Sequence, residues 1–313
     1  MYKILVLNET GCEDFSREYN TFVSALCLAR MGHDVLYVGN TRFAHEFYQG
    51  GHTHDVDIFD LEMPETPAML PVGFEVLSVP RMNAGLTTDS WLKGRIDAFG
   101  KTDIVFYSGN EYMATFGQQV ANYKDGCACS LDWDDMPACV NEVQLRRSRG
   151  SNSPSVTRVL CFKEHAWEQE IANIRNICES LDRYELWIVA RYGNLAEIPH
   201  DRLQQEDVYW QPPLTDSGRF QLLRSATFYV EPSRKATGQG IVEAACCGVP
   251  VIAQCSKETM MDFGSLVSYY SAIPPSDQRD KWDLVEKQRI AQKFYGFAQR
   301  IEYLHNMIKS LEC

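Results

Sequence analysis

One segment of the chain, from Phe228 to Ala253, restricts the possible fold more than any other. It begins with an apolar strand, passes through a loop that contains Gly238 and Gly240, and continues as a short helix of small residues. A Gly-Val-Pro turn and a second apolar strand follow. A strand, a helix and a second strand in this order form a βαβ unit with parallel strands and a right-handed crossover. The segment therefore predicts an α/β protein with parallel sheets.

The same segment is the best candidate for a binding site. Gly238 and Gly240 lead into a helix start, where backbone N–H groups with a partial positive charge can hold a diphosphate. We expect Glu243 in the first turn of this helix, where its carboxylate can accept hydrogen bonds from sugar hydroxyls. A place for an anion beside a place for hydroxyl groups predicts a nucleotide-sugar site.

Strand and helix patterns alternate through both halves of the chain. A length of 313 residues favours two domains of roughly 150 residues each. The segment 141–157 is polar and rich in Ser, Asn, Gly and Pro, which is typical of a linker. We expect one domain over 1–150, a second over 151–290, and a helix over 291–313 that packs back on the first domain. Because ligands bind outside the carboxyl ends of parallel strands, a cleft between the domains is expected.

Short apolar runs predict the individual strands. They are Ile4–Leu7, Val35–Val38, Val76–Val79, Ile104–Tyr107 and Cys127–Leu131 in the first half, and Val159–Phe162, Leu186–Ala190, Val208–Trp210, Phe228–Val230 and Val251–Ala253 in the second. Apolar residues at helical spacing predict one last amphipathic helix over Trp282–Leu311.

Net charge, cysteine spacing and the length of the apolar runs argue against several classes of protein. The net charge is −12, whereas a protein that holds a nucleic-acid backbone normally carries a basic face. Cys127 and Cys129, among eleven cysteines, have no second pair at zinc-ligand spacing, so packing is favoured over metal binding. No apolar run of 18 residues and no cationic leader is present. We therefore expect a cytoplasmic protein without a membrane span or a metal.

Three fragments carry a resemblance to a known family. ALCLARMGHDVLYVG, EPSRKATGQGIVEAACCGVPVIA and AQKFYGFAQRIEYL resemble, in this order, the opening βαβ unit, the donor-binding motif and the closing helix of GT-B glycosyltransferases. The retaining enzymes of family 4 are the most similar group. The resemblance covers nearly the whole chain and is strongest from Val208 onward. It implies two Rossmann-like domains facing a central cleft, and transfer of a sugar from a nucleoside-diphosphate sugar to an acceptor hydroxyl with retention of configuration. It implies no cofactor and no metal.

The resemblance also implies a set of donor-binding residues. The residue that corresponds to Glu243 binds the ribose hydroxyls in the family, and the backbone at Leu214 meets the nucleobase. Where the family usually has a second Glu, this chain has Lys235, which cannot accept hydrogen bonds from hydroxyl groups. Lys235 either pairs with a diphosphate or a donor carboxylate, or is a solvated loop lysine. The full donor-binding set is Gly11, Arg191, Leu214, Lys235, Gly238, Gln239, Gly240 and Glu243.

Three residues are candidates for catalysis. Lys163, at the end of a strand, resembles the basic residue that the family uses on the departing diphosphate, where a fixed cation stabilises the growing charge. Asn110 can hydrogen-bond the transferred sugar, and Glu111 follows it at a position where several relatives carry an acid. A helix cap for Asn110 and an ordinary surface acid for Glu111 are the open alternatives.

Two other functions stay open. Some phage GT-B enzymes glycosylate hydroxymethylated bases in DNA, and Arg146, Arg147 and Arg149 lie where they can meet phosphates, although the net charge opposes DNA binding. Asp132 and Asp134 belong to the loop expected at the acceptor site of a short first domain. The second alternative is a protein that binds a nucleotide-sugar or a partner protein without turnover.

Overall fold

The structure is a computed structural model of the chain. It describes the residues numbered 1–8, 15–39, 71–78, 90–109, 111–131, 138–140, 145, 156–163, 167–178, 181, 183–190, 208–211, 216–231, 238–253, 263–264, 266–269 and 283–311.

The chain forms two compact units. The first takes its described residues from Met1–Gly50, Pro67–Cys139 and Phe297–Cys313, and the second takes them from Val140–Gly296. Each unit is built on a parallel sheet with helices packed against it, so the expected pair of α/β domains is confirmed. The last helix of the chain belongs to the first unit, as expected for a helix that returns to it.

The first unit contains a sheet of five parallel strands in the order β3-β2-β1-β4-β5. The strands are β1 (Lys3–Asn8), β2 (Asp34–Gly39), β3 (Phe74–Ser78), β4 (Ile104–Ser108) and β5 (Cys127–Ser130). In the middle of the sheet Leu5 lies opposite Leu36 of β2 and Val105 of β4. The middle residues of the central strands are apolar because helices cover both faces of the sheet.

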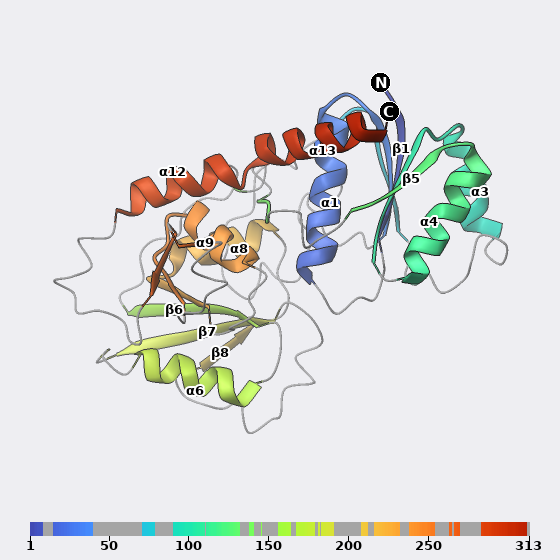
Figure 1. Ribbon diagram of the computed structural model, residues 1–313. Coiled ribbons are helices and arrows are strands. Elements are labelled where there is room, and N and C mark those ends of the chain that lie inside the picture. Colours follow the sequence, from blue (N-terminus) through green and yellow to red (C-terminus); the bar gives the residue numbers. More distant parts are fainter. Residues whose placement is uncertain are drawn as a thin grey trace. The chain divides into compact units, whose positions relative to one another are not determined.

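Among the described residues, helices lie on both sides of the first sheet (Figure 1). On one face lies α1 (Phe15–Arg30), with α13 (Phe297–Leu311) packed against α1, and on the other face lie α3 (Ser90–Phe99) and α4 (Glu111–Lys124). Ile96 of α3 and Phe116 of α4 pack with Leu5 and Leu36 in one buried cluster. On the opposite face, Phe22 of α1 meets the ring of Tyr37 edge-on, with ring centroids 5.4 Å apart.

A buried arginine joins the returning helix to this unit. Arg300 of α13 is 1% exposed, and its Nη2 donates to Oδ1 of Asn20 on α1 at 3.0 Å. The same oxygen accepts a hydrogen bond from the backbone N–H of Cys139 at 3.2 Å. Asn20 therefore holds two segments that are far apart in the sequence.

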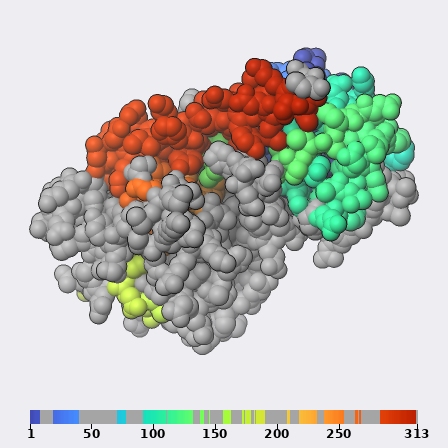
Figure 2. Space-filling view, in the orientation of Figure 1, coloured from blue at the N-terminus to red at the C-terminus, as the bar shows by residue number. Residues whose placement is uncertain are grey.

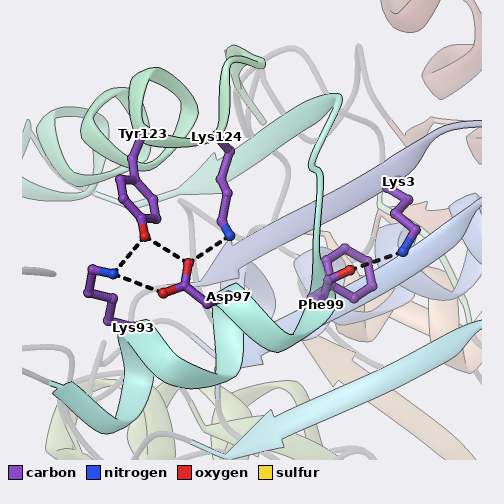
Figure 3. A network of polar contacts seen from close by, with 6 residues as sticks. All are labelled: Lys3, Lys93, Asp97, Phe99, Tyr123 and Lys124. Atoms are coloured by element: carbon purple, nitrogen blue, oxygen red, sulfur yellow. Dashed lines mark hydrogen bonds and ion pairs between the residues drawn. The ribbon is translucent and has the colours of Figure 1, made fainter.

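Polar contacts also join α3 to α4 on the surface of the first unit (Figure 3). The carboxylate of Asp97 accepts hydrogen bonds from Lys124, Lys93 and the hydroxyl of Tyr123 at 2.8–2.9 Å. The Lys124 ammonium, followed by Lys93 and Tyr123, lowers the pKa of Asp97 below its ordinary value. Nearby, Lys3 donates to the carbonyl oxygen of Phe99 at 3.0 Å. The outer side of α4, green in Figure 2, lies at the surface. The contacts of Asp97 are exposed and join two helices, so we assign them a structural role.

The second unit contains a sheet of six parallel strands in the order β11-β10-β9-β6-β7-β8. The strands are β6 (Thr157–Lys163), β7 (Tyr184–Ala190), β8 (Val208–Gln211), β9 (Phe228–Glu231), β10 (Val251–Ala253) and β11 (Val267–Tyr269). Val159 lies opposite Leu186 of β7 and Phe228 of β9, which places β6 at the centre.

Helices cover this sheet as well. Ile174 of α6 (Trp167–Cys178) packs with Val159 and Leu186 in a buried cluster on one face. The helices α8 (Asp216–Ser225) and α9 (Gln239–Cys246) lie on the opposite face (Figure 1). Next to α9 is α12 (Leu284–Phe294), in which Gln288 and Gln292 donate to the carbonyl oxygen of Cys246 at 3.0 Å.

Two elements of the structure differ from what the sequence pattern predicted. The predicted single helix over Trp282–Leu311 is two helices, α12 and α13, with a break at Tyr295 and Gly296. The apolar spacing continues through the break, and for that reason the sequence pattern did not show it. The short strand β11 was not expected because three residues are too few to establish a period. In the described part of the chain, no helix is long and apolar enough to span a bilayer.

Candidate functional site

The predicted donor-binding segment lies where the strand order of the second sheet reverses. From β6 the chain adds β7 and β8 on one side, and then β9, β10 and β11 on the other. The order therefore reverses between β6, which ends at Lys163, and β9, which ends at Glu231. In open α/β sheets, ligands bind outside the carboxyl ends of the strands at this point. The helix α9 is the next described element after β9.

The start of α9 has the properties of an anion-binding site. Gly238 is the N-cap, with a left-handed φ of 75°, and it supplies no side-chain cap to the first turn. A helix start without such a cap is suited to an anion. Glycine is required here because few other residues adopt this left-handed φ. In addition, a Cβ at this position would lie 1.9 Å from the ring of Phe263. That ring packs against Tyr295, with centroids 6.2 Å apart.

The position of Glu243 in the helix differs from the expectation. Since α9 begins at Gln239, Glu243 lies in its second turn, and no acidic residue lies in the first. The helix starts earlier than expected because Gly238 alone, and not Gly240, makes the left-handed turn into it. Both Gln239 and Gly240 are inside the helix and buried.

The carboxylate of Glu243 is held by two other side chains. Nη2 of Arg219 lies 3.0 Å from Oε1, and Nε of Arg219 lies 3.3 Å from Oε2. Gln239 adds a hydrogen bond to Oε1 at 3.0 Å. Glu243 is 0% exposed and Arg219 is 1% exposed. A buried carboxylate is tolerated only with partners of this kind.

Sequence reasoning missed Arg219. It lies on α8 next to Phe220 and four residues before Leu223, both buried, so its helix face points inward. A signal was present, because a Glu expected to be buried requires a cationic partner. The sequence did not show which arginine that would be.

Glu231 is a second residue that sequence reasoning did not single out. It is the last residue of β9 and only 7% exposed. The hydroxyl of Tyr229 donates to its Oε2 at 3.0 Å. A buried acid at the end of a central strand is a signal that could have found it.

Of the three catalytic candidates, the structure describes the backbone of Lys163 and the whole of Glu111. Lys163 is the last residue of β6, where its backbone lies opposite Ala190 of β7. Glu111 is exposed in the first turn of α4, where an acid is favourable to the helix dipole. It follows β4, and the first sheet reverses its order between β1 and β4. The other predicted site residues lie outside the described residues: Gly11, Asn110, Asp132, Asp134, Arg146, Arg147, Arg149, Arg191, Leu214 and Lys235.

The cysteines of the described segments form no disulfide. They are Cys27, Cys127, Cys129, Cys139, Cys161, Cys178, Cys246 and Cys247. Within these same segments, no group of three His, Cys, Asp or Glu side chains forms a metal-binding cluster.

Known structures share this architecture. No protein-family model matches the sequence, and no curated protein does. HepE of Anabaena, in complex with UDP-glucose, superposes with a TM-score of 0.59 at 12% identity, over 99% of this chain and 100% of that one. The glycosyltransferase AviGT4, involved in avilamycin A biosynthesis, gives 0.56 at 15% identity over 99% and 98%.

This is the GT-B fold. The same GT-B architecture occurs in a UDP-N-acetylglucosamine 2-epimerase, which gives a TM-score of 0.50 at 13% identity over 96% of this chain and 94% of that one. At these identities the likeness concerns the fold.

Proposed function

We propose that this protein is a glycosyltransferase that moves a sugar from a nucleoside-diphosphate sugar to an acceptor hydroxyl. One observation carries the proposal. In a GT-B fold, α9 with its Glu243 is the next described element after β9, one of the two strands between which the order of the second sheet reverses. Structures of HepE contain UDP-glucose or UDP, so a UDP-sugar is the first donor to test. Retention of configuration follows from the resemblance to family 4.

In this proposal the second unit holds the donor. The backbone N–H groups at the start of α9 bind the diphosphate, and Lys163 at the end of β6 supplies a cation. Charge grows on the diphosphate as the bond to the sugar breaks, so these groups stabilise the transition state more than the ground state. Asn110 and Glu111 remain candidates for contacts with the transferred sugar. The donor is positioned without a metal ion.

Glu243 is the proposed ligand of the ribose hydroxyls. Arg219 and Gln239 hold its carboxylate in one orientation, so the carboxylate is in place before the nucleoside arrives. Because Glu243 is 0% exposed, the side chains that cover it must move when the nucleoside binds.

Calorimetry with the full chain and UDP, UDP-glucose or GDP-glucose tests the donor site. We expect a uridine nucleotide to bind, and Glu243→Gln to weaken its binding roughly tenfold, the effect of losing a hydrogen bond to a charged group. Glu185→Gln is the matched control, since Glu185 lies on β7 of the same sheet, at the amino end of the strands. Its binding of UDP should equal that of the wild type.

Turnover separates transfer from the alternatives. Release of UDP from UDP-glucose in the presence of simple acceptors supports a glycosyltransferase. Binding without release supports a non-catalytic protein, and isomerised UDP-sugar without release of UDP indicates an epimerase. If neither UDP nor GDP-glucose binds, the proposal is wrong. Unchanged affinity in Glu243→Gln contradicts the ribose assignment alone.

A further inference from the structure

Glu231 occupies a special place in the second sheet. The strand order reverses between β9 and β6, so the last residues of these two strands, Glu231 and Lys163, lie on either side of the reversal point. A ligand bound there reaches the carboxyl ends of both strands. Glu231 is thus an acid at the place where the fold binds ligands, and on the strand that leads to α9.

Its side chain is buried and fixed in position. Glu231 is 7% exposed, and the Tyr229 hydroxyl donates to its Oε2 at 3.0 Å. Tyr229 is itself fully buried, and its ring packs against Phe162 of β6, with centroids 5.4 Å apart. Phe162 directly precedes Lys163. The carboxylate is therefore held by the Tyr229 hydroxyl, and Tyr229 is itself held by packing against the neighbouring strand β6.

A second acid of the same sheet, at the opposite end of its strands, also accepts a hydrogen bond from an aromatic side chain two residues away. On β7, Nε1 of Trp187 donates to Oε2 of Glu185 at 2.9 Å. Trp187 follows its acid by two residues, whereas Tyr229 on β9 precedes Glu231 by two. Glu185 lies at the amino end of the sheet, where its Oε2 is 3.6 Å from Nε of Arg158. The two acids share an aromatic donor and differ in the end of the sheet at which they lie.

We infer that Glu231 accepts hydrogen bonds from hydroxyl groups of the transferred sugar, and so contributes to the choice of a neutral, hydroxyl-bearing sugar. The inference rests on the proposed function. A carboxylate is an acceptor only, so it suits hydroxyl donors and not the phosphate oxygens beside it. The start of α9 takes the diphosphate, which leaves Glu231 for the sugar on the same side of the sheet. Tyr229 acts as a positioning residue for this carboxylate.

The test compares UDP-glucose with UDP, because only the first carries the sugar. Calorimetry on the full chain should show that Glu231→Gln weakens UDP-glucose binding about tenfold, as expected for a lost charge-assisted hydrogen bond. The Kd for UDP should not change. Tyr229→Phe removes one hydroxyl and preserves the ring, so it should cause a smaller loss for UDP-glucose and none for UDP. Glu185→Gln should change neither Kd.

The binding measurements separate a failure of this inference from a failure of the proposed function. Equal weakening of UDP and UDP-glucose by Glu231→Gln, or no weakening of either, overturns the inference and leaves the proposed function standing. If Glu231→Gln does not fold, as judged by circular dichroism, Tyr229→Phe decides in its place by the same comparison. If the wild type binds none of UDP, UDP-glucose and GDP-glucose, the proposed function falls, and this inference falls with it. If it binds GDP-glucose alone, the same comparison is made between GDP-glucose and GDP.

Discussion

The guanidinium of Arg219 on α8 meets both carboxylate oxygens of Glu243 on α9, with Nη2 3.0 Å from Oε1 and Nε 3.3 Å from Oε2. Both side chains are buried, so this contact joins two helices through a desolvated ion pair. It also fixes the orientation of the acid that we propose for the ribose. The stability of the second unit therefore depends on this pair, and under the proposed function the binding of the nucleoside depends on it as well.

Removing Arg219 should destabilise the second unit. Arg219→Met leaves the carboxylate of Glu243 buried without its cation, which typically costs about 3–5 kcal/mol. Urea unfolding followed by circular dichroism measures this change. The double variant Arg219→Met with Glu243→Met should lose less than the sum of the two single variants, because a buried ion pair can be replaced by apolar groups at small cost. Arg289→Met, in an exposed pair on α12, is the control and should not change the stability measurably. Additive losses in the double variant would contradict the coupling.

Gly238 should tolerate no side chain. Gly238→Ala combines the strain of a left-handed φ of 75° with a Cβ 1.9 Å from the ring of Phe263. The backbone strain costs about 1–2 kcal/mol, and displacing a packed ring adds roughly 1–3 kcal/mol. Gly248→Ala is the matched control, with a φ of 77° and its nearest neighbour, the flexible Gln288, at 3.3 Å. Thermal unfolding should show a larger loss at Gly238. Equal losses would mean that the Phe263 ring yields freely.

The thiol of Cys178 should make stability fall at high pH. Burial raises its pKa to about 12 in the folded protein. Above its ordinary pKa the thiol of the unfolded chain loses its proton while the folded one keeps it, so the unfolded state binds fewer protons. The free energy of unfolding should then fall as pH rises from about 9 towards 12, by at most ~1.4 kcal/mol per pH unit. Urea unfolding at pH 8, 9 and 10 measures the slope. Cys178→Ala should give a shallower slope, and an unchanged slope would disprove the assignment.

Asn20 should be essential for docking the last helix in the first unit. Its Oδ1 accepts hydrogen bonds from Arg300 of α13 at 3.0 Å and from the backbone of Cys139 at 3.2 Å. Asn20→Ala leaves both buried donors without this acceptor, at a cost of roughly 2–4 kcal/mol. Asn122→Ala, which alters an exposed amide on α4, is the control. Hydrogen exchange of α13 should increase in Asn20→Ala and stay unchanged in Asn122→Ala. Unchanged protection of α13 in both variants would show that other contacts hold this helix.

Much of the fold could be predicted from local sequence because parallel strands covered on both faces are short continuous apolar runs. The run Ile4–Leu7 became β1 and Val159–Phe162 became β6, and both strands extend beyond these runs into flanking polar residues. The break between α12 and α13 could not be predicted, since the helical spacing of apolar residues passes through it. Phe294, expected on the buried stripe, is half exposed just before that break.

The sequence by itself determined the alternation of strands and helices and the place of the strand–loop–helix segment that leads to α9, because these depend on residues close together in the chain. Tertiary structure alone decided which distant side chains meet: Arg219 with Glu243, Asn20 with Arg300, and Glu231 at the reversal point between β9 and β6. The physical reason is that a buried charge or amide must find its partners in three dimensions, and neither hydrophobic period nor motif spacing records which residues will be there.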